Sequence, residues 1–129
     1  MAGTRKELIY AHECYKIIGV VYEVFNEIGS GHKENIYQKA LAQGFKSHGI
    51  PFEEQRRVKI KFKNEEVGLY ILDFFVFDKI VLELKKRNFF SKKDIEQLFF
   101  YLKATGLKLG LIIHFTQSGV RYKRVVNLM

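Results

Sequence analysis

Apolar residues recur at helical spacing in the first part of the chain. Spacings of three and four residues between Leu8 and Phe25 predict an amphipathic helix with one side toward the core. Thr4 and Glu7 have the spacing of a capping box, in which each side chain satisfies a free backbone N–H, so they predict where this helix begins. The Gly-Ser-Gly segment at 29–31 is expected to end it. The residues predicted to face inward are Leu8, Ala11, Tyr15, Ile18, Tyr22 and Phe25.

A second helix is predicted from about His32 to Ser47. Gly49 is a plausible residue just beyond a helix end, and Pro51 cannot continue a helix, so both mark its C-terminal limit. Its predicted inward positions are Ile36, Ala40, Leu41 and Phe45.

The period changes from helical to alternating after the single proline. Val58, Ile60 and Phe62 alternate with basic residues, which predicts a strand with one apolar and one basic face. The basic positions are Arg57, Lys59, Lys61 and Lys63. After a turn at 64–66, two apolar runs follow at 69–77 and 80–84. Because nearly every position in these runs is apolar, they predict central strands covered on both faces.

The remaining segments complete an alternating α/β order. A helix is predicted from Ser91, with Asp94 as a capping partner, to about Ala104, and Gly106 is expected to end it. A buried strand at 109–115 and an alternating strand at 120–126 follow. The order α-α-β-β-β-α-β-β favours an α/β domain with a central mixed β-sheet flanked by helices.

Composition narrows the class of protein and of partner. The chain has 129 residues, of which 47% are hydrophobic, so one domain spanning 1–129 is expected. A net charge of +8 indicates an anionic partner, with nucleic acid as the first candidate. One cysteine excludes an intrachain disulfide and a cysteine-based zinc cluster. The sequence shows neither a signal-peptide core nor a membrane-length apolar run, so a cytoplasmic protein without membrane contact is expected.

Three charged residues interrupt the two central apolar runs. Asp73 lies in the first run, and Glu83 and Lys85 lie in or directly after the second. A charge in a covered strand costs several kcal/mol unless it is paired or binds a metal. A buried ion pair is one interpretation. The other is a metal site, because Mg²⁺ prefers carboxylate oxygens and Glu-x-Lys places both side chains on one strand face.

The hairpin loop decides whether the two carboxylates can meet. A two-residue turn at 78–79 would set Asp73 opposite Leu84 and send the carboxylates to opposite faces. A three-residue loop at 77–79 pairs Val76 with Ile80 and sets Asp73 opposite Glu83. The metal-site interpretation therefore predicts an odd-length loop or a bulge.

This pattern resembles the PD-(D/E)XK nuclease superfamily, whose core hairpin carries Asp on one strand and Glu-x-Lys on the next. Leu72 stands where that name has proline. Residues 31–37, Gly-His-Lys-Glu-Asn-Ile-Tyr, read as G-x-x-E-x-x-Y and resemble the GxxExxY family within that superfamily. The resemblance runs from about Tyr10 to Val126 and implies a restriction-endonuclease-like core.

The resemblance also implies roles for individual residues. Asp73, Glu83, the backbone carbonyl of Leu84 and Glu34 would hold Mg²⁺ or Mn²⁺, and Lys85 would activate water or stabilise the transition state. Gln97 and Tyr101 match a Gln-x-x-x-Tyr element that would flank the site. The implied catalytic set is Glu34, Asp73, Glu83, Lys85, Gln97 and Tyr101. Without the resemblance, Glu34 and Tyr37 read as a helix-end charge and a core aromatic residue.

The function expected from these features is metal-dependent hydrolysis of DNA or RNA. The predicted nucleic-acid contacts are Lys86, Arg87, Lys92, Lys93, Arg57 and Lys59. Two alternatives stay open: a non-catalytic nucleic-acid-binding module with the same fold, and a protein-interaction domain that acts as a homo-oligomer, of which a homodimer is the simplest form.

Overall fold

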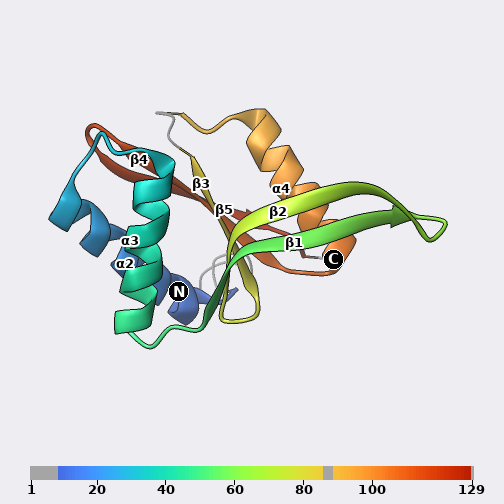
Figure 1. The fold of residues 1–129 in the computed structure, drawn as a ribbon, viewed down its shortest axis with the longest axis horizontal. Coiled ribbons are helices and arrows are strands. Elements are labelled where there is room, and N and C mark those ends of the chain that lie inside the picture. Colours follow the sequence, from blue (N-terminus) through green and yellow to red (C-terminus); the bar gives the residue numbers. More distant parts are fainter. Residues whose placement is uncertain (1–8, 86–88, 129) are drawn as a thin grey trace, which may run out of the picture.

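The protein is described by a computed structural model that covers residues 9–85 and 89–128 (Figure 1). A five-stranded sheet has the spatial order β1-β2-β3-β4-β5. Only β3 and β4 pair in parallel, and every other neighbouring pair is antiparallel. The elements are α2 (Ala11–Ile28), α3 (Glu34–Ser47), β1 (Phe52–Phe62), β2 (Glu65–Val76), β3 (Ile80–Lys85), α4 (Lys92–Thr105), β4 (Leu109–Thr116) and β5 (Gly119–Val126). The predicted element order and mixed α/β sheet are confirmed.

Helices cover both faces of the central strands. One core cluster joins α2 and α3 to alternate sheet residues such as Phe74, Leu82 and Leu111. The other joins α4 to residues of the opposite face, such as Val81 and Ile112. Because β3 and β4 lie between the two clusters, their side chains are buried or nearly so along their whole length. Glu83 and Lys85 therefore lie on a strand that is packed on both faces and is rigid for that reason.

The far ends of β1 and β2 leave this covered region as a two-stranded arm (Figure 1). Leu69 and Ile71 are 39% and 47% exposed, whereas Leu72 and the residues 74–76 are buried. The prediction that 69–77 is covered on both faces is therefore wrong in its first half. An apolar run marks strand propensity, but the extent of the covering helices decides how much of the strand is buried.

The buried side of α2 differs from the predicted one. Tyr15 and Tyr22, expected to face inward, are 80% and 42% exposed. The buried stripe is aliphatic and consists of Cys14, Ile17, Val20, Val21 and Val24. Val20 packs so closely on α3 that a methyl group added at Gly44 would lie 2.6 Å from its Cγ1. The small aliphatic stripe allows this close helix contact, and the tyrosine rings would not.

Smaller differences concern the ends and faces of the helices. In α3, Ile36 is 41% exposed, contrary to prediction, while Tyr37, Leu41 and Phe45 are buried. The predicted ends at Gly29 and Gly106 are confirmed, since both glycines cap helices with positive φ. The capping box at Thr4 and Glu7 lies outside the described residues.

Candidate functional site

The β2–β3 hairpin has the register that the metal-site interpretation requires. Val76 pairs with Ile80 across a loop of residues 77–79, and the ladder continues to the pair Phe74–Leu82. Phe77 and Asp78 both take positive φ, which lets the odd-length loop close. The next residues along the two strands are Asp73 and Glu83, directly beyond the last pair of the β2–β3 ladder.

Hydrogen bonds hold Asp73 at this point. The backbone N–H of Leu84 donates to its Oδ2 at 2.7 Å. The Gln38 side chain of α3 donates to its backbone carbonyl at 3.2 Å. β3 therefore holds the carboxylate of Asp73, and α3 holds its backbone.

The carboxyl groups of Asp73 and Glu83 interact directly. The pKa of Glu83 is raised to about 8, chiefly by burial, and in the same direction by the negative charge of Asp73 and a hydrogen bond between the two side chains. Lys85 acts in the opposite direction but does not outweigh these effects. Near neutral pH Glu83 therefore holds its proton, which is typical of a buried carboxyl group next to a negative charge.

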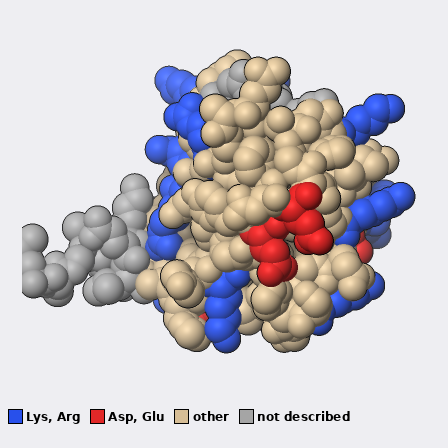
Figure 2. Space-filling model, turned by 90° about the vertical axis from the view of Figure 1, so that its left-hand side faces the viewer, with Lys and Arg blue, Asp and Glu red and all other residues tan. Residues whose placement is uncertain are grey.

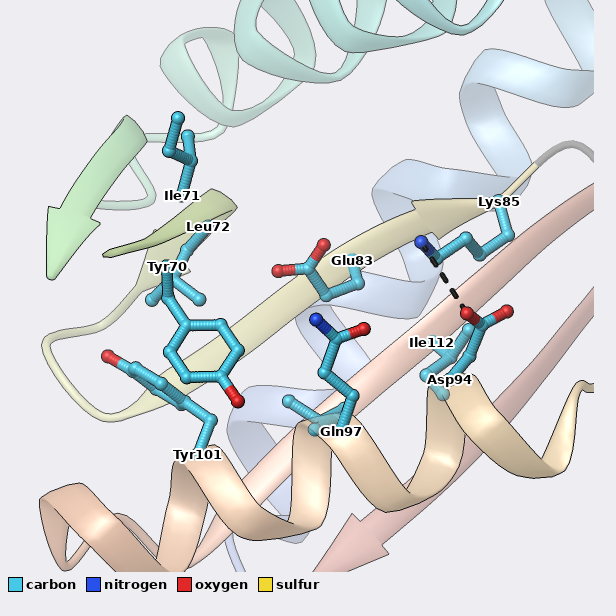
Figure 3. A pocket seen from close by; sticks show the side chains of 10 residues that line it. Tyr70, Ile71, Leu72, Glu83, Lys85, Asp94, Gln97, Tyr101 and Ile112 are labelled. Atoms are coloured by element: carbon cyan, nitrogen blue, oxygen red, sulfur yellow. Dashed lines mark ion pairs between the residues drawn. The ribbon is translucent and has the colours of Figure 1, made fainter. Parts of the chain in front are cut away.

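A cavity of about 160 Å³ opens beside Glu83, between the sheet and α4. Figure 3 shows Glu83 and Gln97 pointing into the same space, with Lys85 at one end and the rings of Tyr70 and Tyr101 at the other. Its lining residues are Tyr70, Ile71, Leu72, Glu83, Lys85, Asp94, Gln97, Leu98, Tyr101 and Ile112. The structure thus brings together four of the predicted site residues, Glu83, Lys85, Gln97 and Tyr101.

Two lining residues with polar groups, Asp94 and Tyr70, were not identified as site residues from the sequence. Asp94 lies 3.8 Å from Lys85 (Oδ1 to Nζ), and its side chain is 9% exposed (Figure 3). Sequence reasoning assigned Asp94 only to helix capping, yet Ser91 makes no side-chain cap bond. The available signal was the spacing 94, 97 and 101, which places these side chains on one face of a helix.

The second such residue is Tyr70 on β2. Its ring meets that of Tyr101 edge to face, with centroids 5.4 Å apart. Burial raises the pKa of Tyr101, and the Glu83 carboxyl adds to that effect while Arg56 opposes it. The two tyrosines therefore form an aromatic wall next to the acidic pair.

Glu34 lies in a separate shallow hollow with Asp73. This hollow, of about 200 Å³, is lined by Glu34, Asn35, Gln38, Gln55, Asp73 and Leu84. Within residues 9–85 and 89–128, no group of three or more His, Cys, Asp or Glu side chains is close enough to hold a metal ion. The predicted roles of Glu34 and of the Leu84 carbonyl as ligands stay predictions, and the main-chain N–H of Leu84 is directed to Asp73.

Tyr37 holds the turn between α2 and α3, next to Glu34 at the start of α3. The Tyr37 hydroxyl donates to the Gly29 carbonyl at 2.7 Å, and its ring stacks on Phe115 with centroids 4.0 Å apart. The His32 ring donates from Nε2 to the Ile28 carbonyl at 2.7 Å. The core-aromatic interpretation of Tyr37 is therefore confirmed, and the residue locks the α2–α3 turn beside the hollow.

The predicted basic contacts are dispersed. Lys86 and Arg87 lie outside the described residues. Lys92 is 91% exposed in its side chain and pairs with Glu96 at 3.8 Å, and Lys93, Arg57 and Lys59 are exposed. On the face drawn in Figure 2, Lys and Arg side chains surround the edge, and a small acidic group lies inside a largely uncharged area. Any nucleic-acid contact there would involve the rim of this face.

Comparison with known proteins agrees with this architecture. The model of the PD-(D/E)XK nuclease superfamily matches residues 11–125. The crystal structure of SSO0001 matches with a TM-score of 0.54 and 16% sequence identity. The match covers 97% of this chain and 62% of that one. At that identity the likeness shows the fold alone. No curated protein matches the sequence significantly. In the described part of the chain, no helix is long and apolar enough to span a membrane. The finer resemblance to the GxxExxY family stays a prediction.

Proposed function

The chain belongs to the PD-(D/E)XK nuclease superfamily, and we propose that it hydrolyses phosphodiester bonds of DNA or RNA with Mg²⁺ or Mn²⁺ held by Asp73 and Glu83. The observation that carries this proposal is the contact between these two carboxyl groups, with Lys85 on the cavity that Glu83 also lines. A purely structural ion pair would explain a contact between Lys85 and one carboxylate. It would not explain why a second carboxyl group lies in contact with the first.

The donor set fits a hard divalent cation. The proton that Glu83 holds near neutral pH can be exchanged for a metal ion, which removes the repulsion between Glu83 and Asp73. Mg²⁺ commonly takes one or two protein carboxylates and completes its shell with water and substrate phosphate oxygens. Bound there, such a cation supplies Lewis-acid activation of a phosphoryl oxygen and of water.

The chain's own residues supply the remaining functions. Lys85 brings a positive charge to the cavity edge, where it can meet a phosphate oxygen and stabilise developing negative charge. Asp94 holds the Lys85 side chain through the 3.8 Å ion pair and acts as a positioning residue. Gln97, which is exposed on α4 and points into the cavity, offers an amide to the same substrate (Figure 3). Tyr101 and Tyr70 limit water access from one end.

Substrate binding rests on charge outside the acidic pair. The net charge of +8 favours a polyanion, and the exposed Lys92 and Lys93 lie at the start of α4, the helix that lines the cavity. Lys86, Arg87, Arg57 and Lys59 stay predicted contacts. We infer that these residues position the backbone without selecting sequence.

The test is a cleavage time course on single- and double-stranded DNA and RNA with Mg²⁺ or Mn²⁺. Wild type should cleave at least one substrate, and EDTA should abolish cleavage. Asp73→Ala, Glu83→Ala and Lys85→Ala should each reduce the rate by about 100-fold or more, since oriented charges at a reaction centre carry several kcal/mol. Asp78→Asn, in the loop of the same hairpin, is the matched control and should keep full activity, because asparagine also tolerates the positive φ of this position.

Two results would contradict the proposal. Cleavage that survives Asp73→Ala would come from a contaminant or from another site. A wild type that shifts nucleic acid in a gel but cleaves none of the substrates with either metal would be a non-catalytic binding module.

A further inference from the structure

The outward side of α2 carries two exposed tyrosines among polar residues such as Lys16 and Glu23. Its inward stripe is already complete, from Cys14 to Val24. Tyr15 and Tyr22 nevertheless lie on the other side, 80% and 42% exposed, and the half-buried Ile18 lies next to them. Neighbouring exposed apolar side chains of this kind indicate a contact site for a partner.

A depression lies in the middle of this outward side. It has a volume of about 490 Å³ and is lined by Tyr15, Lys16, Ile18, Gly19, Val20, Tyr22, Glu23, His48 and Ile50. Gly19, in the interior of α2, contributes no side chain to fill it. A Cβ added at Gly19 would meet no atom within 4 Å, so nothing in the described part of the chain requires glycine there.

Glycine at this position costs stability without an internal reason. A mid-helix glycine is about 1 kcal/mol less favourable than alanine. Gly44 shows the contrast, because its Cβ would lie 2.6 Å from Val20 Cγ1 and the fold itself excludes a side chain there. An exposed glycine that the monomer does not need indicates close approach of a partner at this point.

Charges of opposite sign on either side of Gly19 favour a second copy of this chain as the partner. Lys16 and Glu23 lie on the exposed side of α2, three residues before and four residues after Gly19. We propose that α2 pairs with α2 of a second copy of this chain, antiparallel and two-fold symmetric about Gly19. In this pairing Lys16 of each copy lies opposite Glu23 of the other, and Tyr15 lies beside Tyr22 of the other. The same surface on each copy is then complementary to itself, as a two-fold symmetric interface requires.

The remaining contacts are compatible with this pairing. Glu23 contacts His48 of its own chain at 3.2 Å, and both side chains are about half exposed, so the carboxylate stays accessible to a second cation. α2 and α4 belong to core clusters on opposite faces of the sheet. The dimer therefore leaves the cavity beside Glu83 open.

The experiment compares association with fold stability. Sedimentation equilibrium of wild type across micromolar to submillimolar concentrations should show a species of twice the 15.2 kDa chain mass. Gly19→Gln should raise the thermal unfolding midpoint of dilute, monomeric protein, because glutamine is the better helix former. The same variant should weaken dimerisation by about tenfold or more, because its side chain fills the depression. Gln43→Ala, on an exposed position of α3, is the control and should change neither quantity.

A charge exchange tests the register of the pairing. Lys16→Glu and Glu23→Lys should each weaken the dimer, because each sets like charges opposite one another, and the double variant should recover most of the affinity. A wild type that stays monomeric at all concentrations, or a dimer that Gly19→Gln leaves unchanged, would overturn the proposal. Loss of affinity in the double variant equal to the sum of the single losses would overturn the register.

Discussion

Replacing Glu83 with glutamine should stabilise the metal-free protein at alkaline pH and change its stability little at acid pH. The pKa of Glu83 is about 8 in the fold, against an ordinary value of 4.5. Between these two pH values the folded protein holds a proton that the unfolded chain has released. The stability linked to this proton is fully present below about pH 4.5 and is lost as the pH rises through about 8.

The size of the effect follows from the two pKa values. Each pH unit between them corresponds to about 1.4 kcal/mol, so ionising Glu83 in the fold costs on the order of 5 kcal/mol across the full interval from 4.5 to about 8. Glutamine resembles the protonated acid in shape and cannot ionise. The Glu83→Gln variant should therefore match wild type near pH 5 and exceed it by several kcal/mol near pH 9.

Urea unfolding of both proteins in EDTA, at a series of pH values, measures this difference directly. Effects of titrating groups that do not interact with Glu83 cancel when the two free energies of unfolding are subtracted. Glu66→Gln, on the exposed part of β2, is the matched control and should show a small difference at every pH. Asp73→Asn should reduce the pH dependence attributed to Glu83, because it removes a neighbouring negative charge. A Glu83→Gln difference that does not vary with pH would refute the reasoning.

Three further predictions concern the fold and the surface. Tyr37→Phe keeps the ring on Phe115 but loses the bond to the Gly29 carbonyl, and should lower the free energy of unfolding by about 1 kcal/mol in urea titration. Gly44→Ala should lower it by about 1–3 kcal/mol, because the new methyl group overlaps Val20, and Val20→Ala in the same chain should recover part of that loss. Joint reversal of Lys92 and Lys93 to Glu should weaken nucleic-acid binding for all sequences alike and flatten its salt dependence, as measured by fluorescence anisotropy; an unchanged salt slope would exclude both as phosphate contacts.

Local patterns in the sequence predict the order of elements and the hairpin register. Alternation of side chains has a strict period of two, so the demand that Asp73 and Glu83 share a site fixes the loop at 77–79, and the pairing of Val76 with Ile80 agrees. The positions of Glu83 and Lys85 on the cavity follow from the same alternation, because charges stand out in an otherwise apolar run.

Long-range packing explains what the sequence does not predict. α2 carries two apolar stripes, and only the fit of Val20 against Gly44 decides which one is buried. Likewise, Asp94 and Tyr70 reach the cavity from α4 and β2, and no local pattern states that α4 packs over that part of the sheet. These residues become visible as site residues only when tertiary structure brings them next to Lys85 and Tyr101.

Calorimetric titration of Mn²⁺ into metal-free protein tests the central claim, that Asp73 and Glu83 together hold the cation. Wild type should bind one Mn²⁺ and release a proton below about pH 8, which is measured by repeating the titration in buffers of different ionisation enthalpy. Asp73→Ala and Glu83→Ala should each abolish this binding, while Asp78→Asn should bind as wild type does. Equal binding by wild type and Asp73→Ala, or no binding by wild type at all, would contradict the assignment of these two carboxylates as the metal site.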